Sequence, residues 1–278
     1  MNKLLVFMTD FGLDDGAIAA MEGVAFGVSY DLNIRHLTHN IPPFNIFDAS
    51  YRLHQAIDYW PEGTTFVCVI DPGVGSERKS IVAKTRTNQY IVTPDNGTLT
   101  HIAKHIGISE VREIEEKTNR LVDSETSYTF YGRDVYAYTG ARIAAGVISF
   151  EEVGPLMNVD DLVKLELYGC QKIDNGIMGY VDILDVRYGS LWTSITYEDF
   201  KDCGFKIGDD ILVEIFCQDK KVFSQRINYG KSFADVEINE PIIYMNSVYD
   251  MALAINQGDF SKVYGIGTGK NWMVTFTK

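Results

Sequence analysis

The chain has 278 residues, of which 46% are hydrophobic, and its 38 acidic and 25 basic residues give a formal net charge of −13. That length allows one large domain or two smaller ones, each with a core of its own. The acidic balance argues against a nucleic-acid partner, because such partners are bound largely through Lys and Arg that neutralise phosphates. No apolar stretch approaches the ~20 residues of a membrane-spanning helix, so we expect no membrane partner.

The N-terminus and the cysteines indicate the compartment. The opening stretch, MNKLLVFMTDFG, reaches Asp10 too soon for a signal peptide and lacks a small-residue cleavage site. The four cysteines are scattered, without the paired spacing of a zinc site, which favours reduced thiols. We therefore expect a cytoplasmic protein that needs no metal.

Strand-like and helix-like patterns alternate in the first half of the chain. Apolar stripes at helical spacing run through residues 17–28 and 46–60. The strand-like runs lie at residues 3–9, 33–39, 64–70, 80–85 and 89–94. This alternation predicts an α/β domain over residues 1–160, with a mostly parallel sheet and flanking helices.

The pattern changes from about Gln171 onward. Short strand-like runs follow one another there, separated by turns rich in Gly, Asp and Asn. They lie at residues 179–186, 190–195, 209–217, 221–227 and 272–278. They predict a small all-β, barrel-like domain over residues 172–278, joined to the first domain through residues 151–169.

Acids and amides follow three strands of the first domain. Asp10 and Asp15 come after the first strand, Asp71 after the third, and Asp95 with Asn96 after the fifth. One such acid is usually a turn or helix cap. Ligands of open parallel sheets, however, bind beyond the carboxyl ends of the strands, so three such ends predict a ligand site.

The turn after Asp71, DPGVGSER, is not a phosphate-binding loop. Gly73 and Gly75 are not followed by the third glycine of a dinucleotide fingerprint or by the Gly-Lys-Ser/Thr of a P-loop. The glycines instead indicate a tight turn that lets Arg78 fold back toward Asp71.

Seven segments, in this order, resemble the S-adenosylmethionine hydroxide adenosyltransferases, relatives of the fluorinase and chlorinase. They are TDFGLDDG, HNIPPFNI, IDPGVGSERKSI, TPDNGTLT, TFYGRDVYA, DILDVRYGSLWTSI and YMNSV. The resemblance covers essentially the whole chain. It implies an α/β domain followed by a β-barrel, and a homotrimer whose active sites lie between one subunit's N-terminal domain and its neighbour's C-terminal domain. The implied reaction, which needs no cofactor, displaces methionine from C5′ of S-adenosylmethionine by water or hydroxide and yields adenosine.

The resemblance also implies residue roles. Asp71, Arg78 and Tyr131 match the residues that handle the attacking water. The matching substrate-binding positions are Asp10, Asp15, Phe44, Asp95, Asn96, Phe130, Gly132, Asp185, Tyr188, Ser190, Trp192, Phe233, Asn246 and Ser247. Among them, Asp10 would hold the ribose hydroxyls, Asp185 the ammonium group, with Asp15 as a second candidate, and Ser247 the carboxylate. Trp192 and Phe233 would pack on adenine.

Two positions point to oxygen as the nucleophile. Where the halogenases have a tyrosine, Asp71 would repel a halide yet accept a hydrogen bond from water. Gly132 replaces the halide-binding serine of the fluorinase. Three positions depart from the family: Tyr131 replaces the hydrolases' usual histidine, Ser190 a common asparagine, and Val248 an arginine of the halogenases. A tyrosine hydroxyl can orient water but does not readily take its proton near pH 7.

Two alternatives stay open. TDFGLDDG also resembles the calcium-binding motif of nucleoside hydrolases, although Met8 stands where that motif begins with Asp. Alternatively, Tyr131 marks decayed catalysis, and the protein binds adenosine or S-adenosylmethionine without turning it over.

Overall fold

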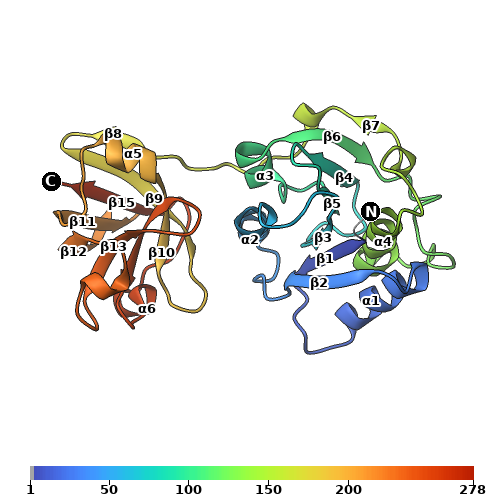
Figure 1. The fold of residues 1–278 in the computed structure, drawn as a ribbon, viewed down its shortest axis with the longest axis horizontal. Coiled ribbons are helices and arrows are strands. Elements are labelled where there is room, and N and C mark those ends of the chain that lie inside the picture. The colour runs from blue at the N-terminus through green and yellow to red at the C-terminus, as the bar shows by residue number, and fades with distance from the viewer. Residues whose placement is uncertain (1–2) are drawn as a thin grey trace. The chain divides into compact units, whose positions relative to one another are not determined.

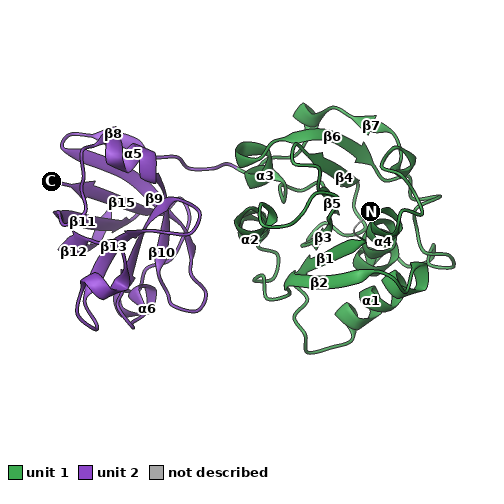
Figure 2. Cartoon of the chain, viewed as in Figure 1, with its two compact units in different colours: residues 1–165 green, residues 166–278 purple. Residues whose placement is uncertain are grey.

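The structure, a computed structural model, describes residues 3–278 and forms two compact units, residues 1–165 and 166–278 (Figure 2). Each unit has a buried apolar core made by its own strands and helices. Within the described residues, no helix combines the length and the apolar character needed to cross a membrane.

Unit 1 is a seven-stranded sheet with helices on both faces (Figure 1). Its strands are β1 (Leu4–Thr9), β2 (Asn33–Thr38), β3 (Thr65–Val69), β4 (Ser80–Thr85), β5 (Tyr90–Pro94), β6 (Ile108–Glu113) and β7 (Leu156–Met157). Its α-helices are α1 (Ala17–Val28), α2 (Ile46–Ile57), α3 (Thr100–His105) and α4 (Tyr138–Ala145).

The central strand β1 shows why its sequence is apolar without a break. Leu5 and Phe7 point into the core that α1 and α4 cover, whereas Val6 and Met8 point into the core that α2 and α3 cover. A strand buried on both faces cannot alternate polar and apolar residues. The same burial explains the apolar run of β3, which pairs in parallel with β1.

The sheet is mixed, so the prediction of a mostly parallel sheet is not confirmed. Parallel pairs join β1 to β2, β1 to β3 and β3 to β5, but β4 pairs antiparallel with β5 and β6, and β6 pairs antiparallel with β7. The connection between β4 and β5 spans only residues 86–89. So short a link makes a hairpin, whereas a parallel pair needs a crossover connection of a dozen or more residues.

Unit 2 is an eight-stranded, barrel-like sheet, as expected for a small all-β domain. Its strands are β8 (Gln171–Ile173), β9 (Gly176–Leu184), β10 (Leu191–Thr196), β11 (Asp210–Cys217), β12 (Lys220–Tyr229), β13 (Pro241–Met245), β14 (Asp250–Ile255) and β15 (Trp272–Thr277). The short helices are α5 (Tyr197–Asp202) and α6 (Phe260–Tyr264). The strand order is β10-β14-β13-β12-β11-β15-β9-β8, and a further pairing of β10 with β9 closes the sheet.

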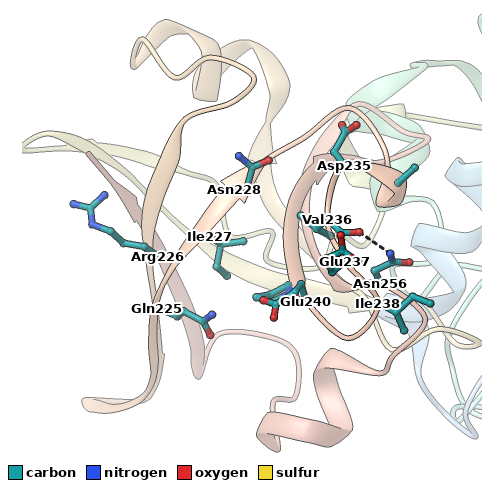
Figure 3. A pocket seen from close by; sticks show the side chains of 12 residues that line it. Gln225, Arg226, Ile227, Asn228, Asp235, Val236, Glu237, Ile238, Glu240 and Asn256 are labelled. Carbon is teal, nitrogen blue, oxygen red and sulfur yellow. Dashed lines mark hydrogen bonds between the residues drawn. The ribbon is translucent and has the colours of Figure 1, made fainter.

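The weakest seam of this barrel lies between β12 and β13. The two strands pair in parallel at only two positions, Asn228 with Ile242 and Tyr229 with Ile243. Beyond that pairing, β12 and residues 234–241 diverge around a cavity of about 540 Å³ (Figure 3). Asn256 stabilises the far wall by donating from Nδ2 to the carbonyl of Val236 at 2.9 Å.

Much of the segment that we expected to link the domains packs on unit 1. β7 pairs with β6, and Leu162 is buried in the core beneath α2 and α3. The backbone N–H of Leu165 donates to the Thr100 hydroxyl at 3.0 Å. The two units divide directly after this contact.

Candidate active site

A buried ion pair lies at the carboxyl end of β3. Arg78 Nη2 donates to Asp71 Oδ2 at 2.6 Å, and Nε lies 3.0 Å from both carboxylate oxygens. The Asp71 side chain is 5% exposed and that of Arg78 10%. Burial, the largest single effect, lowers the pKa of Arg78, but the hydrogen bonds to Asp71 and the electrostatic effects of Tyr136, Asp71 and Tyr131 together hold that pKa above its ordinary value. Arg78 therefore stays charged.

Two glycines allow the turn that brings these residues together. A Cβ on Gly73 would lie 3.3 Å from both Arg78 Cγ and Ser76 Oγ, so a larger residue would press on the folded-back arginine. Gly75 has a φ of +77°, a conformation that other residues adopt at a cost. The predicted turn chemistry thus corresponds to a real close approach.

Aromatic rings and a hydroxyl enclose the ion pair. The Arg78 guanidinium lies 4.8 Å from the ring centroid of Tyr131 and 5.6 Å from that of Tyr136. Arg78 Nη1 donates to Ser80 Oγ at 3.0 Å, and Ser80 lies 3.2 Å from the Tyr136 hydroxyl. Burial and then the Asp71 carboxylate raise the pKa of Tyr136, so its hydroxyl keeps its proton and points it at Asp71 Oδ2, 3.5 Å away.

A π-helical turn, Gly132–Ala137, places the two tyrosines together. Residues five apart share one face of such a turn, and the ring centroids of Tyr131 and Tyr136 lie 6.4 Å apart. Short π-helical stretches are frequent at functional sites. Tyr131 also has a second cation beside it, because the guanidinium of Arg120 lies 4.9 Å from its ring centroid.

Phe130 and Gly132 connect this cluster to the loop after β1. A Cβ on Gly132 would lie 3.1 Å from the Phe11 ring, and the Phe11 and Phe130 rings meet edge to face with centroids 6.0 Å apart. Beside Phe11, the Asp10 carboxylate accepts the backbone N–H of Phe44 at 2.9 Å. Phe44 itself has a φ of +66° and an exposed side chain.

Three of the predicted binding residues in unit 1 have structural partners. Asp15 accepts the N–H of Ala17 at 2.8 Å, at the first residue of α1. Asp95, whose pKa burial raises, accepts the N–H of Val163 at 3.0 Å. Asn96 donates to the carbonyl of Ile70 at 2.8 Å, directly before Asp71. Asn96 therefore braces the strand end that carries the ion pair.

Asp185 organises the turn between β9 and β10 in unit 2. Its Oδ1 accepts the backbone N–H groups of Arg187 and Tyr188 at 3.0 and 3.2 Å. Its own N–H donates to the Ser190 carbonyl at 2.9 Å. Tyr188 and Ser190, with Phe233, line a cavity of about 760 Å³. The other lining residues are Arg187, Ile255, Gln257, Gly258, Asp259 and Lys262. The cavity of Figure 3 contains none of the predicted site residues.

Tyr244, on β13, joins three of the predicted residues. Its hydroxyl accepts from Trp192 Nε1 at 3.3 Å and is hydrogen-bonded to Ser190. Its ring centroid lies 5.0 Å from that of Phe233. Trp192 and Tyr244 share a face of the sheet because each pairs directly with Ala252 on the strand between them.

The turn between β13 and β14 carries Asn246 and Ser247. Asn246 Oδ1 accepts the N–H groups of Val248 and Asp250, each at 3.0 Å. Within the described residues, the buried Nδ2 of Asn246 has no hydrogen-bond partner. A buried donor of this kind is costly to leave unpaired, so it is a natural contact for a ligand. Ser247 is exposed beside it.

Sequence reasoning missed Ser80, Arg120, Tyr136 and Tyr244. Ser80, Tyr136 and Tyr244 lie inside the quoted motifs, so those motifs already contained the signal. Their roles depend on which side chains face one another across strands, which spacing alone does not show. In residues 3–278 there is also no group of three or more His, Cys, Asp or Glu that could hold a metal ion.

The fold and the site together define a two-domain protein. Its α/β unit carries a buried carboxylate–guanidinium pair, and its β-barrel unit carries an aromatic-lined cavity. Residues 5–154 match the SAM hydroxide adenosyltransferase N-terminal domain, and residues 179–273 match the corresponding C-terminal domain. The chain belongs to the S-adenosylmethionine hydroxide adenosyltransferase family.

Individual relatives agree with this assignment. An (R)-S-adenosyl-L-methionine hydrolase of Methanocaldococcus jannaschii is 35% identical, over 76% of this chain and 73% of the relative. Another of that name, from Salinispora tropica, is 30% identical over 97% and 96%. The crystal structure of an uncharacterized conserved protein from Thermotoga maritima superposes with a TM-score of 0.87 and is 31% identical, over 99% of this chain and all of that one.

Proposed function

We propose that the protein is an S-adenosyl-L-methionine hydrolase that forms adenosine and L-methionine. Relatives that are 30–35% identical over most of the chain carry that activity in their names. The single observation that carries the mechanism is the buried Asp71–Arg78 pair at the end of β3.

The hydrogen bonds of Asp71 indicate where water would be held. Oδ2 is occupied by Arg78 Nη2 and Nε and faces the Tyr136 hydroxyl, whereas Oδ1 faces Arg78 Nε at 3.0 Å. A carboxylate oxygen has two lone pairs, so Oδ1 can accept a further hydrogen bond from water. Arg78 and Ser80 keep the carboxylate in one orientation, which makes Asp71 a fixed acceptor for the nucleophile.

The proposed reaction needs little beyond position and partial desolvation. The water oxygen forms a bond to C5′ while the C5′–S bond breaks. The electron pair of the C5′–S bond goes to the sulfonium sulfur, which becomes the neutral thioether of methionine. The proton lost by water leaves through the hydrogen bond to Asp71. Holding water in line behind the carbon that carries a good leaving group supplies most of the needed catalysis.

The proposed substrate contacts divide between the two units. Asp10 accepts the Phe44 N–H through Oδ2 and keeps Oδ1 for ribose hydroxyls. In unit 2, the cavity beside Ser190 and Phe233 would hold adenine, with Trp192 beside it. Asp185, Asn246 and Ser247 would receive the ammonium and carboxylate groups of the methionine moiety.

Incubation with S-adenosylmethionine, with and without chloride, followed by product identification, tests this proposal. We expect adenosine and methionine in both incubations. A 5′-chloronucleoside would mean that a halide is the nucleophile. If no adenosine forms over hours at stoichiometric enzyme while calorimetry shows tight binding, the protein is a binding protein, an alternative that the tyrosine at position 131 favours.

The calcium-dependent nucleoside hydrolase alternative rested on residues 9–16 alone. There, Asp15 bonds the start of α1 and Asp10 bonds Phe44, whereas the family match runs through both units. Dialysis against a chelator provides a direct test: activity that is lost and then restored by calcium would support the nucleoside hydrolase.

We also propose, from the family resemblance, that the protein is a cytoplasmic homotrimer in which one subunit's N-terminal domain and its neighbour's C-terminal domain share each active site. Sedimentation equilibrium tests the trimer. Mixing an Asp71→Asn chain with a chain altered at Asp185 tests the shared site, because mixed trimers would regain activity.

A further inference from the structure

A line of hydrogen-bonded side chains connects the surface of unit 1 to the base of the Asp10 loop, and the proposed mechanism does not use it. Glu22 Oε1, on α1, lies 2.9 Å from Nε2 of His36, on β2. His36 Nδ1 lies 2.7 Å from His39 Nε2. His39 Nδ1 lies 2.9 Å from the hydroxyl of Thr9, the last residue of β1.

The direction of each hydrogen bond follows from the chemistry of the two ends. A carboxylate only accepts, so His36 Nε2 donates to Glu22. In a neutral His36, Nδ1 then accepts the proton of His39 Nε2. His39 Nδ1 is left as an acceptor for the Thr9 hydroxyl, whose oxygen in turn accepts the N–H of Phe11 at 3.2 Å.

In this order of hydrogen bonds, each imidazole carries its proton on Nε2 and accepts through Nδ1. Burial, and then the neighbouring His36, lower the pKa of His39 to about 4, which agrees with a neutral ring near pH 7. Thr9 and His39 are both buried. Each of the four ring nitrogens then has a partner, and at the buried Thr9–His39 end such a satisfied polar network is rigid.

Two hydrogen bonds attach the loop that carries Asp10 to this line of side chains. The Thr9 side chain holds the N–H of Phe11, and the backbone carbonyl of His39 accepts the N–H of Gly12 at 2.8 Å. Between these attachments lies Asp10, whose carboxylate already uses Oδ2 for Phe44. Its orientation therefore depends on where Thr9 and His39 sit.

We propose that Glu22, His36 and His39 are positioning residues that hold residues 9–12 so that the Asp10 carboxylate faces the ribose hydroxyls of the nucleoside. This inference rests on the proposed function. This line of side chains affects how tightly the nucleoside part of the substrate is bound, equally in the ground state and the transition state. It does not affect the displacement step.

Steady-state kinetics of two variant pairs test the proposal. Thr9→Val removes the hydroxyl at nearly constant volume, and we expect the KM for S-adenosylmethionine to rise about tenfold with kcat within twofold, because uniform binding is lost. Thr9→Ser restores the hydroxyl and should restore KM. Glu22→Leu should raise KM about threefold, whereas Glu22→Gln, whose amide oxygen still accepts from His36, should stay near the wild-type KM.

The Glu22 pair separates positioning from simple packing, because both variants fill the same space and only one keeps the acceptor. Thermal unfolding checks that each variant is folded. Equal KM values for Glu22→Leu and the wild type, or a fall in kcat at constant KM in Thr9→Val, would overturn the proposal.

Nitrogen-15 NMR of the histidine rings tests the proposed hydrogen-bond order without measuring enzyme activity. We expect His36 and His39 as neutral Nε2–H tautomers in the wild type, and loss of the single His36 tautomer in Glu22→Leu. Nδ1–H tautomers in the wild type would refute the hydrogen-bond order. If the wild type forms no adenosine, the proposed function fails on its own, and adenosine affinity measured by calorimetry replaces KM as the test of the Thr9 and Glu22 variants.

Discussion

The two halves of the candidate site differ in how completely the protein satisfies its own polar groups. In unit 1, Asp71 and Arg78 are almost fully buried and bind each other, with Ser80 and Tyr136 around them. In unit 2, Tyr188 is 70% exposed, Phe233 is 44% exposed, and the Asn246 amide has a donor without a partner in the described residues. This difference is what we expect if, as proposed, Asp71 and Arg78 position the attacking water and the residues of unit 2 bind the substrate, because preorganisation matters most for the reacting groups.

The largest effect should come from disrupting the buried Asp71–Arg78 pair of unit 1. We expect Asp71→Asn to lower kcat by about 10²- to 10⁴-fold, the range of a lost acid–base or water-orienting group, with much less change in substrate affinity. Product formation and calorimetric binding are the measurements. Glu77→Gln, in the same turn but exposed, is the matched control. Equal losses of rate and affinity in Asp71→Asn would contradict the water-handling role.

The second largest effect should come from a change in the candidate binding residues of unit 2. Tyr244→Phe removes the hydroxyl that Trp192 and Ser190 share, so both lose a contact that orients them, and we expect KM to rise roughly tenfold with kcat nearly constant. Tyr168→Phe, which removes a hydroxyl bonded to the exposed Glu166, should change neither constant. A fall in kcat alone would show that these residues of unit 2 also take part in the chemistry.

A smaller effect should follow from restoring the family's histidine. Between the Arg78 and Arg120 guanidiniums, the imidazole of a Tyr131→His variant would stay neutral and could take a proton from water, so we expect kcat to rise about fivefold. Single-turnover rates would show it. An unchanged rate would mean that Tyr131, with Tyr136 and Arg120 around it, already has a working substitute for the histidine.

The last effect concerns stability and not activity: the loss of stability in acid should belong to unit 1, because all five histidines lie there. His54, His101 and His105 stack against one another between α2 and α3. Burial, and then the neighbouring histidines, lower the pKa of His101 to about 3. Burial, and then His54, lower that of His105 to about 4.

The sign of the pH dependence follows from these lowered values. Below the unfolded pKa of 6.5, the unfolded chain takes up protons that the folded chain does not, so stability is full above pH 6.5 and is lost as the pH falls. For the buried His101 alone we expect about 2 kcal/mol less free energy of unfolding at pH 5 than at pH 6.5. Calorimetry of the wild type and of His101→Gln measures this. Equal slopes in the two proteins would contradict it.

Much of the local structure could be read from the sequence. The stripe over residues 17–28 became α1 at those same bounds, and the runs that contain β1, β3, β4 and β5 were all expected as strands. Strands with weaker sequence patterns were missed, among them β6 in unit 1 and the adjacent pair β13 and β14 in unit 2. β6 lies near the edge of the sheet and carries the charged residues Glu110 and Arg112, so it lacks the continuous apolar run of β1 and β3. The mixed order of the sheet was missed because strand patterns do not state direction.

For the candidate site, the sequence supplied the motifs but not their partners. The turn glycines predicted that Arg78 folds back toward Asp71, and the two are joined by hydrogen bonds. The contact of Tyr136 with that pair depends on a π-helical turn, and the contact of Tyr244 with Trp192 depends on the register of three strands. The sequence also did not show that Asp15 and Asp95 accept backbone N–H groups; their expected contacts with the substrate stay predictions.

By itself, then, the amino-acid order determined the family, the two-unit division into α/β and β-rich halves, and the residue types available at each strand end, because these depend on local periodicity and on contiguous motifs. Only the tertiary structure decided which polar groups are paired and which remain open. That outcome depends on strand direction, register and burial, which bring together side chains as distant in sequence as Thr9 and His39, or Trp192 and Tyr244.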